Sequence, residues 1–168
     1  MIYLIGYMGS GKTTLAKKLS KRLQLPFLDT DFEIEKKENK SISDIFKDEG
    51  ELYFRMLETQ LLIQLNSKAI IACGGGIPMY NDNMSIINTK GISIYLKASA
   101  NDLANRLKDE KQHRPLITNK PDEKLEDYIK EDLQNRSSYY TLSHHTVSIN
   151  NKTEDELLRE VYALISTL

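Results

Sequence analysis

The residues most able to do chemistry stand near the start of the chain, at positions 6–13, which read GYMGSGKT. This segment fits the phosphate-loop pattern G-x-x-x-x-G-K-[ST], and it follows an apolar run at 2–5 that predicts a buried strand. Its glycines let backbone N–H groups line a hollow that side chains would fill, and a helix predicted at 12–23 points the positive end of its dipole at the same hollow. The segment predicts a phosphate site, in which Lys12 reaches the β and γ phosphates and Thr13 ligates Mg²⁺.

Two carboxylates follow the next apolar run, in the segment Asp29-Thr30-Asp31. Alternate residues of an extended segment face the same way, and the carboxyl edge of a parallel sheet is where ligands of open α/β folds bind. One acid could hold Mg²⁺ through water while the other accepts a hydrogen bond from an attacking hydroxyl. The alternative is that one of them only caps the helix predicted at 31–38. We expect at least one to be functional.

A helix predicted at 50–66 carries Arg55 and Glu58. At about 100° per residue, Glu58 falls about 40° from the centre of the apolar stripe, and Arg55 lies on its flank. Two interpretations stay open. The pair is an ordinary surface contact between positions i and i+3, or Glu58 orients Arg55 so that its guanidinium grips a carboxylate with two hydrogen bonds.

Arg136, in a helix predicted at 123–142, also faces inward. It lies about 20° from the line through Leu125 and Ile129, so it points at the protein rather than at water. Either Asp132, four residues earlier, pairs with it or a ligand does, and both can hold. Two inward arginines on separate helices favour an acidic substrate.

Two more segments border the predicted site. Three glycines at 74–76 follow an apolar run and weaken any strand or helix, which indicates that something approaches this backbone closely. The stretch 108–124 is rich in charge and proline, so it is either a mobile lid or a plain surface loop. Within it Arg114 precedes a proline; it is either an electrostatic clamp on a transferring phosphoryl group or a solvated charge.

The rest of the chain alternates short apolar runs with helical patterns. The predicted strands are 2–5, 26–28, 69–72, 92–96 and 146–149. The predicted helices are 12–23, 31–38, 50–66, 79–87, 100–109, 123–142 and 154–167. This alternation predicts an α/β fold with a parallel sheet covered by helices on both faces, and 168 residues fit a single domain spanning 1–168.

The composition excludes several functions. The 23 Lys and Arg nearly cancel the 24 Asp and Glu, so no excess field draws the protein to nucleic acid or a membrane. Cys73 is the only cysteine, which excludes an internal disulfide and a cysteine metal cluster. Neither a leader pattern nor a run of 18 apolar residues occurs, so we expect a cytoplasmic protein with small-molecule partners.

These motifs together resemble shikimate kinases in order and spacing. The matching elements are the phosphate loop, Asp29-Thr30-Asp31, Phe54-Arg55 with Glu58, Gly74-Gly75-Gly76, Arg114-Pro115-Leu116, and Arg136 with Tyr140. The resemblance spans nearly the whole chain. It implies a nucleoside-monophosphate-kinase-like fold of sheet order 2-3-1-4-5, and transfer of the ATP γ-phosphate to the 3-hydroxyl of shikimate in the pathway to chorismate and the aromatic amino acids.

The resemblance also implies a role for each matching residue. Asp31 would hold the shikimate hydroxyls and is the proposed base. The carboxylate would be held by Arg55 and Arg136 and the ring by the amides of Gly75 and Gly76, in a shikimate-binding region that includes about 31–60. Lys12 and Arg114 would neutralise the phosphoryl group, and Thr13 with Asp29 would hold Mg²⁺. The nucleotide site would comprise Gly9, Ser10, Gly11, Lys12, Thr13, Thr14, Arg114 and Lys152. We expect a monomer that binds only the small molecules ATP and shikimate.

One loop departs from the family's pattern. Where the family commonly has an arginine and a proline contacting adenine, this chain reads NNKTE at 150–154, so we expect Lys152 to stack on adenine instead.

Two rival functions remain. The tetrapeptide at 119–122 spells the guanine-reading motif N-K-x-D of GTP-binding switches, but it does not follow a strand-like run, and the chain has no D-x-x-G. A kinase of another polyol acid, such as gluconate, would share the loop and the fold.

Overall fold

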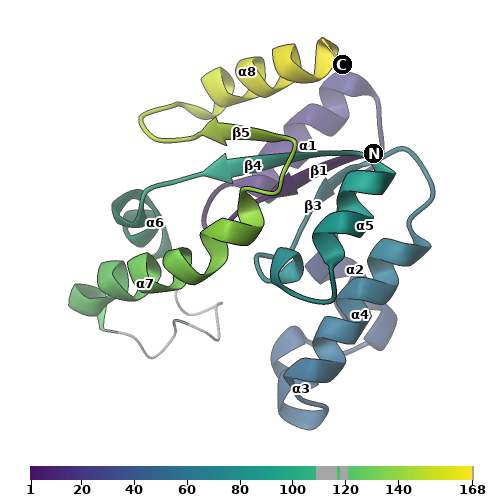
Figure 1. Cartoon of the computed structure of the whole chain (residues 1–168), viewed down its shortest axis with the longest axis vertical. Helices are drawn as coiled ribbons and strands as arrows, with labels where there is room; N and C mark the ends of the chain where they lie inside the picture. Colours follow the sequence, from purple (N-terminus) through teal and green to yellow (C-terminus); the bar gives the residue numbers. More distant parts are fainter. Residues whose placement is uncertain (109–116, 118–120, 168) are drawn as a thin grey trace.

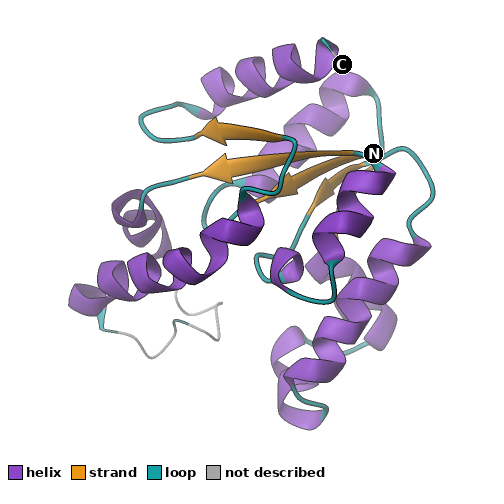
Figure 2. Cartoon of the chain, viewed as in Figure 1, coloured by secondary structure: helices purple, strands orange, loops and turns teal. Residues whose placement is uncertain are grey.

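The computed structural model describes residues 1–108, 117 and 121–167. Five parallel strands form one sheet of order β2-β3-β1-β4-β5, and Figure 2 shows the strands running in the same direction. The strands are β1 Ile2–Ile5, β2 Phe27–Asp29, β3 Ile70–Ala72, β4 Ile92–Lys97 and β5 His145–Ser148. Leu4 in the central strand lies opposite Ala72 of β3 and Ile94 of β4. The predicted fold class and sheet order are confirmed.

Helices cover both faces of this sheet. They are α1 Lys12–Leu23, α2 Thr30–Glu38, α3 Ile42–Asp48, α4 Glu51–Gln64, the short 3-10 helix η1 Ile77–Met79, α5 Asn83–Lys90, α6 Ala100–Leu107, α7 Asp122–Tyr140 and α8 Glu154–Ser166. In the view of Figure 1, α1 lies behind the sheet and α5 in front of it. Because both faces are covered, the inner strands are continuous apolar runs rather than alternating ones, and all four residues of β1 are buried.

Two helices differ from the sequence prediction. α3 was not predicted, because its seven residues are too few for a clear helical period; Ser41 caps it by accepting a hydrogen bond from the Asp44 N–H at 3.1 Å. The helix predicted at 79–87 is instead η1 followed by α5. The interruption lies at Asn81 and Asp82, whose φ values of 50° and 54° are left-handed and do not continue a right-handed helix.

The buried apolar side chains form two clusters. The larger fills the space between the sheet and its helices. The smaller joins α2, α3 and α4 through Ile34, Ile45, Phe54 and Leu57, all at most 5% exposed. This second cluster fixes α4, and therefore Arg55, relative to the helix that follows β2.

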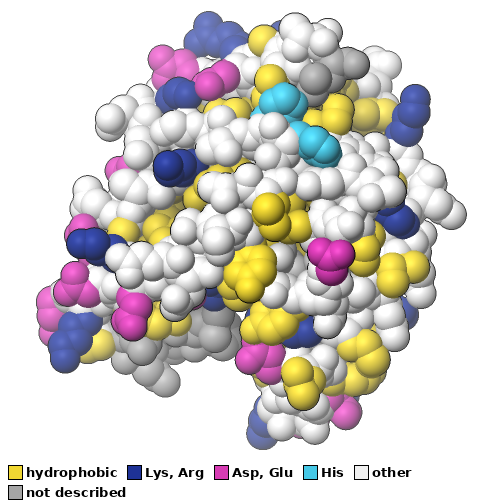
Figure 3. Space-filling model, in the orientation of Figure 1, with side chains coloured by type: hydrophobic (Ala, Val, Ile, Leu, Met, Phe, Trp, Pro, Cys, Tyr) yellow, Lys and Arg dark blue, Asp and Glu magenta, His cyan; other side chains and the backbone are white. Residues whose placement is uncertain are grey.

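The charges on the surface are mixed, as the nearly equal numbers of basic and acidic residues predict. On the face drawn in Figure 3, Lys and Arg side chains are interspersed with Asp and Glu. Within the part of the chain that the structure describes, no helix has both the length and the apolar character needed to cross a bilayer.

Candidate active site

Two cavities meet beyond the carboxyl ends of the strands. The first has a volume of about 770 Å³ and is lined by the phosphate loop, the start of α1 and the start of α8. The second, of about 340 Å³, is lined by residues of α2, α3, α4 and α7. Met8, Asp31, Gly74 and Gly75 line both cavities. Groups bound in the two cavities would therefore both lie beside Asp31.

The phosphate loop holds its lysine by backbone carbonyls. Gly9 and Gly11 have φ values of 78° and 81°, which favour glycine. Lys12 Nζ donates to the carbonyls of Gly6 at 2.9 Å and Tyr7 at 2.8 Å, and the side chain is buried against the loop. The described members of the predicted nucleotide site all line the first cavity: Gly9, Ser10, Gly11, Lys12, Thr13, Thr14 and Lys152.

Asp29 serves two purposes at the end of β2. One carboxylate oxygen accepts the Asp31 backbone N–H at 3.1 Å, so Asp29 caps α2, although capping is not its only contact. The other oxygen accepts a hydrogen bond from Thr13 Oγ1 at 2.8 Å on the wall of the first cavity. Across the described residues no group of three or more His, Cys, Asp or Glu could hold a metal. The Thr13 and Asp29 oxygens suit Mg²⁺, which takes few protein ligands beside phosphate and water.

Asp31 lies where the two cavities join. A Cβ on Gly74 would come within 2.5 Å of Asp31 Oδ1 and 3.2 Å of Glu58 Oε1. Only glycine lets both carboxylates approach this backbone so closely, which explains the first glycine of the triplet. The Gly74 N–H is in turn fixed by donating to Thr30 Oγ1 at 2.8 Å.

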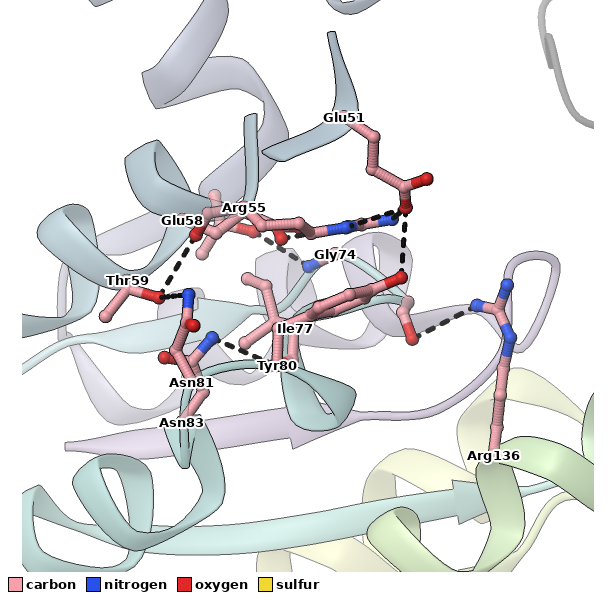
Figure 4. Close-up of polar contacts among 12 residues, drawn as sticks. Glu51, Arg55, Glu58, Thr59, Gly74, Ile77, Tyr80, Asn81, Asn83 and Arg136 are labelled. Carbon is pink, nitrogen blue, oxygen red and sulfur yellow. Dashed lines mark hydrogen bonds and ion pairs between the residues drawn. The ribbon is translucent and has the colours of Figure 1, made fainter. Parts of the chain in front are cut away.

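Arg55 is held between two carboxylates of its own helix, as Figure 4 shows. Its Nη1 donates to Glu58 Oε2 at 2.9 Å, while Nε and Nη2 donate to Glu51 Oε1 at 3.2 and 2.9 Å. Tyr80 Oη donates to the same Glu51 oxygen at 3.0 Å. Glu58 is only 1% exposed and Arg55 7%, so the interpretation of a surface pair is wrong.

The pKa values of the two carboxylates beside Arg55 are shifted in opposite directions. Burial raises the pKa of Glu58 to about 7, although the Arg55 charge and hydrogen bond pull that pKa down. The Arg55 hydrogen bond lowers the pKa of Glu51, which lies nearer the solvent. Glu58 is therefore only partly ionised near neutral pH, whereas Glu51 carries a negative charge.

Arg136 enters the second cavity from α7, opposite Arg55. It is 7% exposed; its Nε donates to Asp132 Oδ1 at 2.8 Å and its Nη1 to the Gly75 carbonyl at 3.3 Å. The predicted partner Asp132 is confirmed, and the side chain still faces a cavity. Tyr140 Oη donates to the same Gly75 carbonyl at 2.8 Å.

The last glycine of the triplet is required by Arg55. A Cβ on Gly76 would collide with the Arg55 guanidinium. All five predicted substrate-binding residues line the second cavity: Asp31, Arg55, Gly75, Gly76 and Arg136. The triplet thus allows Asp31 and Arg55 to approach the same turn.

Two residues of the predicted nucleotide site, Arg114 and Lys152, need separate comment, and one residue that lines the first cavity was not predicted. Arg114 and most of the predicted lid at 108–124 lie outside the described residues. Lys152 lines the first cavity while its Nζ pairs with Glu160 Oε2 at 2.5 Å. Arg106, at the end of α6, also lines this cavity, with Nη1 3.5 Å from the Gly9 carbonyl. No sequence signal singles it out, because one arginine in a helix's last turn is common.

The guanine-reading interpretation of 119–122 does not fit its surroundings. Asp122 is the first residue of α7 and does not follow a strand, whereas a base-reading aspartate would stand at a strand end. Asn119 and Lys120 lie outside the described residues.

Comparison with known proteins gives one consistent family. A family model described as shikimate kinase matches residues 8–166. A shikimate kinase of Flavobacterium johnsoniae is 44% identical over 169 residues, covering 98% of both chains. The crystal structure of a shikimate kinase from Bacteroides thetaiotaomicron superposes with a TM-score of 0.89 at 32% identity, covering 98% of this chain and 97% of that one. A shikimate kinase from Acinetobacter baumannii in complex with shikimate gives a TM-score of 0.89 at 33% identity, covering 99% and 92%.

Proposed function

This chain belongs to the shikimate kinase family, and we propose how its residues divide the work of transferring the ATP γ-phosphate to the 3-hydroxyl of shikimate. The observation that carries the proposal is the pair of cavities that meet at Asp31. One has a phosphate loop and a lysine, and the other has two buried arginines. A triphosphate fits the first and an anionic alcohol the second.

The phosphate loop is the donor site. Its amide groups and the N-terminus of α1 hold the phosphates, and Lys12 leaves its two loop carbonyls to neutralise the charge that develops on the transferring group. Thr13 and Asp29 would hold Mg²⁺, with water and phosphate oxygens completing its shell. The bound ion supplies positive charge to the β and γ phosphates.

The acceptor site positions shikimate through its carboxylate. Arg55 and Arg136 enter the second cavity from α4 and α7, and two guanidinium groups compensate one carboxylate that is removed from water. Gly75 and Gly76 leave room for the ring against their backbone. Asp31, at the junction of the cavities, accepts a hydrogen bond from the attacking hydroxyl and points it at the γ-phosphate.

Three further residues complete the proposed nucleotide site. Arg106 and Lys152 both line the first cavity, and the planar guanidinium of Arg106 offers the better face for stacking on adenine. Arg114, outside the described residues, is assigned to the transferring phosphoryl group from its place before Pro115 in the sequence. We also propose that residues 1–168 act as one monomeric, cytoplasmic kinase domain, which size-exclusion chromatography with light scattering tests for its oligomeric state.

The experiment is a coupled ADP-release assay with shikimate, gluconate and AMP as acceptors. Shikimate is expected to give stoichiometric ADP and the other two little, since gluconate lacks a rigid ring and AMP lacks a carboxylate for the two arginines. Equal rates with gluconate would overturn the substrate assignment. K12A should lose most of its activity in the same assay, while the exposed Lys17 of the same helix supplies the matched control K17A, which should retain activity.

A further inference from the structure

One side chain of the phosphate loop is buried outside both cavities. Tyr7 is 1% exposed and lines neither cavity. Its hydroxyl donates to Asp132 Oδ2 at 2.7 Å, across 125 positions of the sequence. Burial raises the pKa of Tyr7, and the hydrogen bond to Asp132 adds to the shift, so the hydroxyl stays protonated and remains a donor.

Asp132 connects Tyr7 to the acceptor site. Its second oxygen accepts Arg136 Nε at 2.8 Å, so one carboxylate joins the tyrosine to the arginine. The guanidinium of Arg136 also lies over the Tyr7 ring, 5.2 Å from its centroid. Tyr7 therefore restrains Arg136 in two ways, through the shared carboxylate and through its ring.

We infer that Tyr7 is a positioning residue for the acceptor carboxylate, which orients Arg136 through Asp132 while belonging to the loop that binds the donor. The inference rests on the proposed role of Arg136. An arginine fixed before the substrate arrives loses less side-chain entropy on binding. With the tyrosine hydroxyl removed, Asp132 would keep one of its two hydrogen bonds, and the guanidinium would sample more orientations.

The effect should fall on the acceptor and not on ATP. The contact of Tyr7 with the donor side is made by its backbone, since its carbonyl accepts Lys12 Nζ at 2.8 Å. A change to phenylalanine keeps that carbonyl and keeps the ring below Arg136. It removes only the hydrogen bond to Asp132.

The test is steady-state kinetics of Y7F with both substrates varied. We expect the KM for shikimate to rise about fivefold, the size of a lost hydrogen bond to a charged group that acts indirectly. The kcat and the KM for ATP should stay unchanged. The matched control is Y3F, since Tyr3 is equally buried in β1 and its hydroxyl donates to Met1 Sδ at 3.3 Å. Y3F should leave all three constants unchanged, and thermal melts establish that each variant is folded.

A double-mutant cycle with R136K separates positioning from general damage. R136K alone should raise the KM for shikimate, and Y7F should add nothing in that background, because the group it positions is gone. An unchanged KM in Y7F, or an equal rise with and without Arg136, would overturn the inference while leaving the proposed function intact. If R136K itself left the KM unchanged, the proposed role of Arg136 would fail first.

Discussion

Replacing Glu58 by glutamine is expected to remove a pH dependence from the folding stability. The Glu58 side chain is almost fully buried, and burial raises its pKa to about 7 even though Arg55 Nη1 lies 2.9 Å away. In the unfolded chain the pKa of a glutamate is about 4.3. Between these two values the folded protein holds a proton that the unfolded chain has released.

The sign of the effect follows from this difference. Because the folded state binds more protons in this window, the free energy of unfolding falls as the pH rises from about 4.3 to about 7. The difference between these two values is roughly 2.5 pH units, and at about 1.4 kcal/mol per unit it amounts to between about 3 and 4 kcal/mol. The contribution of Glu58 to the free energy of unfolding is therefore present in full below about pH 4.3 and is lost above about pH 7.

The assay is urea unfolding of wild type and E58Q across this range, followed by circular dichroism. Glutamine has the shape of a protonated glutamate and cannot ionise. The free energies of unfolding of the two proteins should therefore converge near about pH 4, and E58Q should be more stable by about 3 to 4 kcal/mol near about pH 8. Glu51, on the other side of Arg55, supplies a control of opposite sign because its pKa is lowered. E51Q should match wild type in acid and fall below it at neutral pH. A stability difference between E58Q and wild type that did not change with pH would refute the raised pKa.

Other substitutions test the roles assigned to single groups. K12A should lower kcat by at least about 100-fold with little change in Tm, as measured by ADP release and thermal melts, because its partner is charge in the transition state. R136A should raise the KM for shikimate about tenfold or more while kcat changes less, and an unchanged KM would count against its carboxylate contact. G76A should raise the same KM, because its methyl group displaces the neighbouring guanidinium; a KM equal to that of wild type would mean that this close approach does not matter. D29N should raise the Mg²⁺ concentration needed for half-maximal rate, and an unchanged requirement would remove Asp29 from the metal site.

The donor side of the site was predictable because its parts are contiguous. A strand, a glycine turn, Lys12 and a helix stand next to one another in the sequence, and each has a local physical signature. The inward direction of Glu58 and Arg136 also follows from helical period alone, since the neighbouring apolar residues define the buried face of each helix.

The polar contacts that hold the acceptor side in place could not be predicted, because they join residues far apart in the sequence. The hydrogen bond from Tyr80 to Glu51 joins residues 29 positions apart, and the bond from Tyr7 to Asp132 joins residues 125 apart. No local pattern marks either tyrosine as a polar partner. α3 was missed for a different reason. Its seven residues give no clear helical period, and the packing of Ile45 into the small cluster with α2 and α4 is not visible in a local pattern.

The most direct test of the whole account is a crystal structure with a non-hydrolysable ATP analogue, Mg²⁺ and shikimate bound together. We expect the β and γ phosphates beside Lys12, the metal between Thr13 and Asp29, and the shikimate carboxylate within hydrogen-bonding distance of both Arg55 and Arg136. A triphosphate bound away from the glycine loop, or a shikimate whose carboxylate turns from the two arginines, would contradict it.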